Sequence, residues 1–112
     1  MNRKRLPTLI AETILNRSIC SVNVGACLVD RFGVFEVGWN SMGSSGMGEH
    51  AEASCLRRAN RKRLARSTLY VAARRQKSGN TLTARPCFEC QRILGGVGKV
   101  IYRDGLSKWR EL

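Results

Sequence analysis

Two short segments carry the residue types from which a metal-dependent hydrolytic site is built. His50-Ala51-Glu52 brings an imidazole and a carboxylate, and Pro86-Cys87-Phe88-Glu89-Cys90 brings two thiols three residues apart. Zinc binds Cys thiolates and His nitrogen, and a catalytic zinc keeps three protein ligands and leaves a fourth position to water. The chain has one histidine, which excludes a site with two histidines from this chain. We predict His50, Cys87 and Cys90 as ligands of Zn²⁺.

Glu52 is the candidate catalytic residue beside that metal. Zinc lowers the pKa of a bound water from about 16 toward about 7 in favourable sites. A carboxylate next to such a water can take its proton and pass it on. Glu52 is not needed as a ligand, so we predict it as the proton shuttle. This chemistry suits the hydrolytic removal of ammonia from an aminopyrimidine or an aminopurine.

The other cysteines leave one alternative open. Cys55 could join the three predicted ligands in a closed structural site, which would exclude catalysis, or it could be a small buried side chain one turn into a helix. The chain has five cysteines, and an odd number with one close pair does not indicate a disulfide framework. We therefore expect a reducing compartment, the cytoplasm.

Both motifs need a helix N-terminus to present them. Cys87 and Cys90 are three residues apart and share one face of a helix, and Pro86 suits its first turn. A helix N-terminus also favours the thiolate that zinc requires. His50 and Glu52 are two residues apart and converge only at the first turn of a helix. We therefore predict that two helix N-termini face one point.

The surrounding pattern predicts a single α/β domain over residues 1–112. Helical spacing covers 6–18, 49–65 and 87–94, and strand patterns cover 20–30, 34–39, 67–73 and 99–103. A glycine-rich loop spans 40–48, a polar connection spans 74–85, and residues after 104 form a short tail. Strand-helix-strand units at this spacing favour a layered sheet.

The chain is strongly basic. Lys and Arg total 20 and Asp and Glu total 8, which gives a net charge of +12 and predicts attraction to phosphate. Six cations crowd the second predicted helix and form a solvated face, a phosphate-backbone track or an oligomer contact: Arg57, Arg58, Arg61, Lys62, Arg63 and Arg66. No apolar run approaches 18 residues and no apolar stretch follows the basic start, so we expect neither a membrane span nor a secretory signal.

With these motifs in view, the sequence resembles the cytidine deaminase superfamily from about Ser21 to Asp104. The pattern H-x-E…P-C-x-x-C is the signature of zinc nucleobase deaminases. Three further segments are similar to strands of the deoxycytidylate and tRNA-editing branch: Gly38-Trp39-Asn40, Ser67-Thr68-Leu69-Tyr70-Val71 and Gly98-Lys99-Val100-Ile101-Tyr102. The compact form is similar to short deaminases encoded by phages.

The resemblance implies a three-layer fold with a mixed sheet of about four to five strands and zinc between two helix N-termini. It also implies that Asn40 hydrogen-bonds the sugar and that the Ala51 N–H binds the base carbonyl. Attack at C4 of a cytosine would then yield uracil, with Glu52 protonating N3 and the leaving amine. Two neighbours of the cysteines complete the candidate substrate contacts, Arg85 for a phosphate and Phe88 for the base.

Three functions follow from these observations. The first is a zinc deaminase that converts a pyrimidine nucleotide, deoxycytidylate above all, to its uracil form. The second keeps the chemistry but acts on single-stranded DNA or RNA, such as tRNA, with the basic surface as a track. The third is a non-catalytic nucleic-acid-binding module with structural zinc. Family members continue past the position of Asp104 with a strand and a helix, so we expect a shortened pocket wall or one completed by a second subunit in a homo-oligomer.

Overall fold

The computed structural model describes residues 5–42, 48–106 and 108–112, with the side chains of residues 5, 88 and 89 outside the description. Along the chain the elements are α1 (Arg5–Ile14), the 3-10 helix η1 (Leu15–Arg17), β1 (Val22–Asp30), β2 (Gly33–Trp39), α2 (Ala51–Arg58), α3 (Arg61–Leu64), β3 (Thr68–Arg75), β4 (Thr81–Leu82), α4 (Phe88–Ile93), the 3-10 helix η2 (Leu94–Gly96), β5 (Lys99–Arg103) and β6 (Trp109–Glu111).

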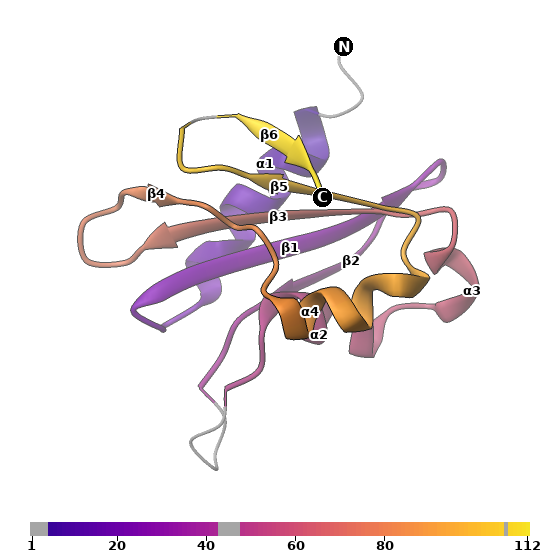
Figure 1. Ribbon diagram of the computed structural model, residues 1–112, viewed down its shortest axis with the longest axis horizontal. Helices are drawn as coiled ribbons and strands as arrows, with labels where there is room; N and C mark the ends of the chain where they lie inside the picture. Colours follow the sequence, from indigo (N-terminus) through magenta and orange to yellow (C-terminus); the bar gives the residue numbers. More distant parts are fainter. Residues whose placement is uncertain (1–4, 43–47, 107) are drawn as a thin grey trace.

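The strands form one mixed sheet in the order β2-β1-β3-β5-β6, with β4 paired to β3 (Figure 1). β3 and β5 run parallel, whereas the other pairs are antiparallel. The central strand β3 is buried on both faces because its residues are apolar without alternation. Leu69 and Val71 face one core cluster, and Tyr70 and Ala72 face the other.

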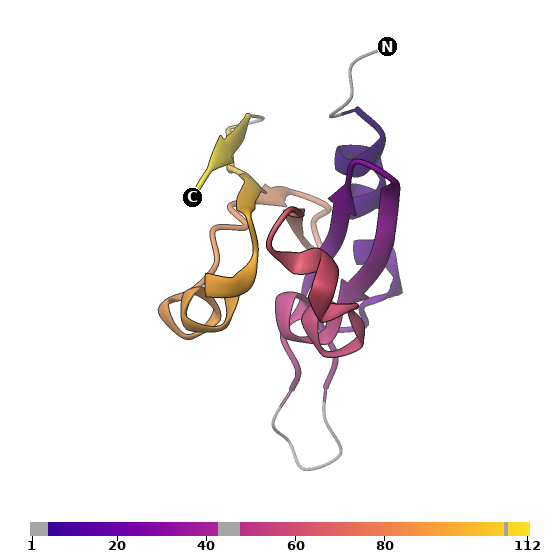
Figure 2. The same cartoon turned by 90° about the vertical axis from the view of Figure 1, so that its right-hand side faces the viewer.

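Helices cover the two faces of the sheet and make three layers. α1 packs through Ala11 and, with Leu15 of η1, joins the cluster that contains Tyr70. α2 and η2 pack on the opposite face through Cys55 and Leu94. In Figures 1 and 2, α2 and α4 lie together on one side of the sheet and α1 lies on the other. The expected three-layer α/β architecture is therefore confirmed.

The helix expected over 49–65 is two helices. Ala59 and Asn60 adopt extended backbone angles between α2 and α3, and the Asn60 side chain accepts a hydrogen bond from the Lys62 N–H at 3.0 Å. An asparagine side chain competes for backbone donors and favours the N-cap position over a helix interior. The break separates the cations of α3 from those at the end of α2.

The sheet has six strands, two more than the sequence pattern shows. β4 is a two-residue strand inside the expected polar connection, and β6 lies in the expected tail. Trp109 of β6 packs edge-on against Tyr70, with ring centroids 6.0 Å apart, so the residues expected to form a short tail are part of the sheet. No helix in the described ranges has the length and apolar character needed to cross a bilayer.

The β1–β2 turn follows the expected tight geometry. Asp30 pairs with Gly33 across the hairpin, and Gly33 has a φ of 114°, which a side chain would strain. The Asp30 carboxylate accepts the Phe32 N–H at 2.9 Å. This leaves Arg31 and Phe32 at the tip of the hairpin, both exposed.

Candidate functional site

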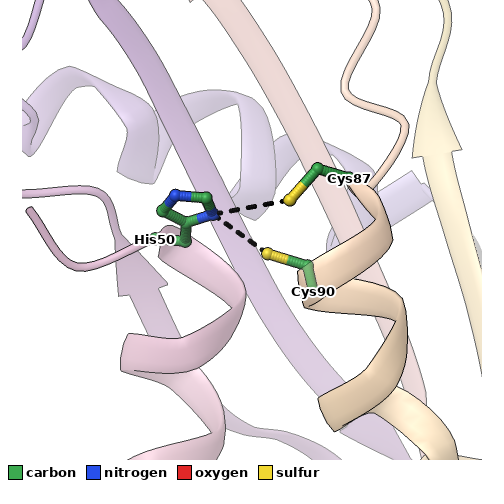
Figure 3. A group of neighbouring side chains, drawn as sticks. All are labelled: His50, Cys87 and Cys90. Atoms are coloured by element: carbon green, nitrogen blue, oxygen red, sulfur yellow. Dashed lines mark hydrogen bonds between the residues drawn. The ribbon is translucent and has the colours of Figure 1, made fainter.

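His50 and Cys87 stand at equivalent positions of two helices. His50 is the N-cap of α2 and Cys87 is the N-cap of α4, each with extended backbone angles and no side-chain bond to its own helix. Their side chains are therefore free to project beyond the helix ends. Figure 3 shows the His50 ring directed at the sulfurs of Cys87 and Cys90. The prediction that two helix N-termini face one point is therefore confirmed.

The three donor atoms fit a zinc ion. His50 Nδ1 lies 3.0 Å from Cys90 Sγ and 3.9 Å from Cys87 Sγ, and all three ligand atoms lie within 4.8 Å of one another. Tetrahedral zinc, with bonds of about 2.3 Å to sulfur and about 2.0 Å to nitrogen, separates nitrogen and sulfur by about 3.6 Å. The two measured distances bracket that value. Cys90 is buried, whereas His50 and Cys87 are exposed, so the group is open on one side.

Glu52 lies in the first turn of α2, directly beside this group. Its side chain is 5% exposed, and burial raises the pKa of its carboxyl, against smaller lowering effects that include His50 and Cys90. Burial also raises the pKa of the Cys90 thiol. An acidic side chain in the first turn is favoured by the helix dipole. The carboxyl and the ligand group thus share one enclosed corner between α2 and α4.

A pocket of about 230 Å³ opens onto this corner. It is lined by His50, Glu52 and Cys87 together with the predicted substrate contacts Asn40, Ala51 and Arg85. Apolar residues form the rest of its wall apart from one hydroxyl, and none of them was predicted as a contact: Val22, Val24, Ala73, Thr83 and Ala84. The pocket therefore combines a mainly apolar wall with a few polar groups, as small-molecule sites do.

Asn40 is fixed by the backbone of β1. Its side-chain oxygen accepts the Val24 N–H at 2.9 Å, and its amide donates to the Val22 carbonyl at 2.8 Å. These bonds hold the end of β2 against the start of β1, where the pocket wall forms. The second amide N–H of Asn40 has no hydrogen-bond partner among the described residues. Asn40 and His50 also line a neighbouring pocket of about 280 Å³.

The remaining predicted contacts differ in how they are placed. Ala51 is the first residue of α2 and is fully buried, and the N–H groups of a first turn have no acceptor within the helix. Arg85 is exposed at the pocket, and no carboxylate pairs with it in the described part of the chain. The side chain of Phe88 lies outside the described residues, so its contact with the base stays a prediction.

The connection that carries Arg85 to the site depends on a long-range bond. The Ala84 N–H donates to the Arg103 carbonyl at 2.8 Å, which fastens the connection to β5 just before Pro86. Thr83 precedes this bond and lines the pocket. Sequence reasoning missed Thr83 and Ala84 because nothing in the polar connection signals the bond to β5. Val22 and Val24 lie two residues apart on β1 and therefore face the same side of the sheet.

Cys55 does not join the metal group. It is fully buried one turn further along α2, packs in the core cluster on that face of the sheet, and its pKa is raised by burial. Within the described ranges, the residues whose donor atoms could hold an ion are His50, Cys87 and Cys90. The open alternative of a closed four-ligand site with Cys55 is therefore contradicted.

The rim of the site begins at a short bridge. Ser41 and Glu49 exchange two backbone hydrogen bonds of 3.0 Å and close the base of the glycine-rich loop. Glu49 also accepts two bonds from Arg57, at 2.9 and 3.0 Å. Residues 43–47 of the expected glycine-rich loop lie outside the described residues. The bridge places the start of α2 directly after this loop, as the sequence indicates.

Known structures resemble this chain in fold. A cytidine deaminase from Burkholderia pseudomallei superposes with a TM-score of 0.73 at 18% identity, covering 100% of this chain and 92% of that one. A dCMP deaminase from the cyanophage S-TIM5 in apo form gives 0.69 at 24% identity, covering 93% and 86%. A cytidine deaminase from Mycobacterium leprae gives 0.69 at 18% identity, covering 99% and 94%. No curated protein sequence matches the chain.

The sequence family agrees with the fold and with the donor set. A family model described as the cytidine and deoxycytidylate deaminase zinc-binding region matches residues 3–103. That span includes His50, Glu52, Cys87 and Cys90, and the donor atoms suit Zn²⁺. This chain belongs to the cytidine and deoxycytidylate deaminase family.

Proposed function

We propose that the chain is a zinc-dependent hydrolytic deaminase of a free cytosine nucleotide, with deoxycytidylate as its preferred substrate. The observation that carries this proposal is the convergence of Glu52 and the His50–Cys87–Cys90 group on one small pocket. A nucleic-acid-binding module with structural zinc has no need of a buried carboxylate beside an open metal group.

His50, Cys87 and Cys90 would hold the metal. A zinc ion in such a site lowers the pKa of water toward neutrality, which supplies a nucleophile at physiological pH. Glu52 takes the proton of the attacking water, delivers it to N3 of the base, and delivers the second proton to the leaving amino group. Water and cytosine are thereby converted to uracil and ammonia.

Other groups of the pocket would position the substrate. The Ala51 N–H donates to the base carbonyl, and the free amide N–H of Asn40 donates to the sugar. The apolar wall excludes water from the faces of the ring. Arg85, exposed and without a carboxylate partner in the described part of the chain, binds the phosphate. The side chain of Phe88 is proposed to contact the base.

The substrate is tested by measuring ammonia release from dCMP, cytidine and a cytosine-containing oligonucleotide at two salt concentrations. We expect turnover of dCMP with a lower KM than cytidine. Turnover of the oligonucleotide alone, falling steeply with salt, would show that the second candidate is correct. That candidate is favoured by one observation, the presence near α3 of Lys62 and Arg66, which form no ion pair in the described part of the chain.

Arg85→Gln separates the role of the phosphate from the chemistry. If Arg85 binds the phosphate, the KM for dCMP rises about tenfold while the KM for cytidine and the kcat for both stay within twofold. An equal rise for cytidine and dCMP would show that Arg85 does not read the phosphate. Lys77→Gln removes an exposed cation of the same connection and serves as the matched control.

A further inference from the structure

A second pocket lies at the opposite end of β1 from the catalytic one. It has a volume of about 380 Å³ and is lined by Asp30, Arg31, Phe32, Lys62, Arg63 and Arg66. In Figure 1 the β1–β2 turn and α3 lie together on the right, whereas α4 begins left of centre. From Val24 at the catalytic pocket to Asp30 at this one, β1 spans about 20 Å. The two pockets are therefore separate.

Two of the residues that line this pocket, Asp30 and Arg63, form an ion pair. Arg63 donates to both oxygens of Asp30, at 2.6 and 2.7 Å, and this pairing lowers the pKa of the Asp30 carboxyl. The Arg63 guanidinium also lies 4.1 Å from the ring centroid of Phe35. Such a two-bond pair between a planar cation and a carboxylate fixes orientation as well as charge. Asp30 is thus neutralised, and Arg63 is held in place.

Three further cations at this pocket have no such partner. Arg31, Lys62 and Arg66 form no ion pair among the described residues, although each lines the pocket. Unpaired cations around a concave surface concentrate positive potential and attract phosphate groups. Part of the positive charge of the chain is therefore concentrated at this pocket.

An exposed aromatic ring stands among these cations. The Phe32 side chain is at the hairpin tip, 76% exposed, with the Arg31 guanidinium 4.7 Å from its ring centroid and that of Arg63 at 6.0 Å. Aromatic rings flanked by arginines are the platforms on which bases of single strands stack, while the cations follow the backbone. A duplex cannot use such a ring because its base faces are already stacked.

We propose that this pocket binds single-stranded nucleic acid, with a base stacked on Phe32 and phosphates held by Arg31, Lys62 and Arg66. The binding is separate from the catalytic pocket and does not require that the strand be deaminated. It gives the cations of α3 a role that the deamination of a free nucleotide leaves unexplained. The contribution of the cations to the affinity falls as the salt concentration rises, whereas the contribution of stacking on Phe32 does not.

The test is fluorescence anisotropy with a labelled deoxythymidine oligonucleotide, which contains no cytosine and is not a substrate of the proposed reaction. Phe32→Ala should weaken binding about tenfold without changing the salt dependence. The triple variant R31Q/K62Q/R66Q should flatten the slope of log K against log salt by about 2, since each phosphate contact on a single strand contributes about 0.7. If the triple variant fails to fold, Arg31→Gln alone should still flatten the slope by about 0.7.

A matched triple variant removes the same charge elsewhere. Arg75, Lys77 and Arg92 are exposed and lie outside this pocket, so R75Q/K77Q/R92Q should keep the affinity within about threefold. Equal weakening by both triple variants would show diffuse attraction and overturn the proposal. The proposal would also be overturned if the oligonucleotide did not bind, or if Phe32→Ala weakened the binding of a duplex equally. Competition by free thymidylate at the same nucleotide concentration would overturn it too.

Deamination of dCMP is measured on the same variants. It should be unchanged in Phe32→Ala, because Phe32 lies at the far end of β1. If the chain does not deaminate dCMP but still binds the strand, the proposed function is contradicted and the strand-binding proposal is not. The failure of this proposal is therefore distinguishable from the failure of the proposed function.

Discussion

Gly38 of β2 lies against the backbone of Cys55 of α2 so closely that a methyl group on Gly38 would stand 2.7 Å from the Cys55 nitrogen. The Ala51 carbonyl would be equally close. Because backbone atoms cannot yield as a flexible side chain does, α2 approaches the sheet only where β2 has no side chain. The position of α2 determines where His50 and Glu52 stand.

Gly38→Ala should therefore damage both stability and the site. Overpacking costs about 1–3 kcal/mol, which lowers Tm by roughly 4–8 °C for each kcal/mol in a domain of this size class. Displacement of α2 should also reduce the rate of dCMP deamination and the zinc content. Thermal unfolding, metal analysis and activity check these effects.

Gly95→Ala is the control for that prediction. A methyl group at Gly95 would meet nothing within 4 Å, and its φ is not in the left-handed region. Its Tm and activity should match those of the unmodified chain. Equal behaviour of the two variants would show that the close approach at Gly38 does not hold α2 in place.

The metal group makes a second prediction about the cysteines. Cys87→Ser, Cys90→Ser and His50→Ala should each lose most of the bound zinc, since a site of three protein ligands loses one of them. Cys55→Ala should keep about one zinc per chain, even though a cavity in the core lowers its Tm. Metal content is measured on the purified proteins. Loss of zinc in Cys55→Ala at a temperature well below its Tm would contradict the assigned ligand set.

Much of this site is predictable because its signals are local. Pro86 marks the start of one helix, and the glycine-rich loop before His50 marks the start of the other. The chemistry of the residues at these two helix starts follows from their types and spacing. The break at Asn60 is also local, but an asparagine within a basic helical pattern is a weak signal. The core strand β3 is predicted correctly because its apolar run is unbroken.

The rest depends on contacts that no local pattern contains. β6 pairs with β5 and packs against the sheet through Trp109 on Tyr70, a residue 39 positions earlier in the chain. Thr83 reaches the catalytic pocket because the Ala84 N–H binds the carbonyl of Arg103. Neither pairing is encoded in the residues that surround these positions. Short edge strands and pocket walls form only once the sheet is assembled.

Glu52→Gln should separate metal binding from proton transfer. The amide keeps the size of the side chain but cannot accept and return a proton, so deamination should fall at least 100-fold while zinc content stays near one per chain. Thermal stability should stay the same or rise, because burial of the carboxyl in the folded chain is unfavourable. Ammonia release, metal analysis and unfolding are measured on one preparation. Retention of activity would exclude Glu52 as the shuttle.

Asp104 predicts how stability depends on pH. Its carboxylate accepts the N–H groups of Leu106 and Lys108 at 2.8 and 2.9 Å and that of Arg110 Nε at 2.6 Å, and these bonds lower its pKa to about 2. An unfolded aspartate has a pKa of about 3.9. Between the folded and the unfolded pKa, the unfolded chain therefore binds more protons than the folded chain. The stabilisation is therefore complete above about pH 4 and is lost as the pH falls toward about 2.

Asp104→Asn removes this contribution while keeping the shape of the side chain. The Tm of the unmodified chain should exceed that of the variant by a constant amount at neutral pH, and the gap should close as the pH falls from about 4 to about 2. Glu111→Gln is the control, because Glu111 is exposed and lies 3.7 Å from Lys99, a pair that contributes little. The Tm of Glu111→Gln should match that of the unmodified chain at every pH. A Tm difference for Asp104→Asn that does not change below pH 4 would mean that the charge of the Asp104 carboxylate does not hold the β5–β6 turn.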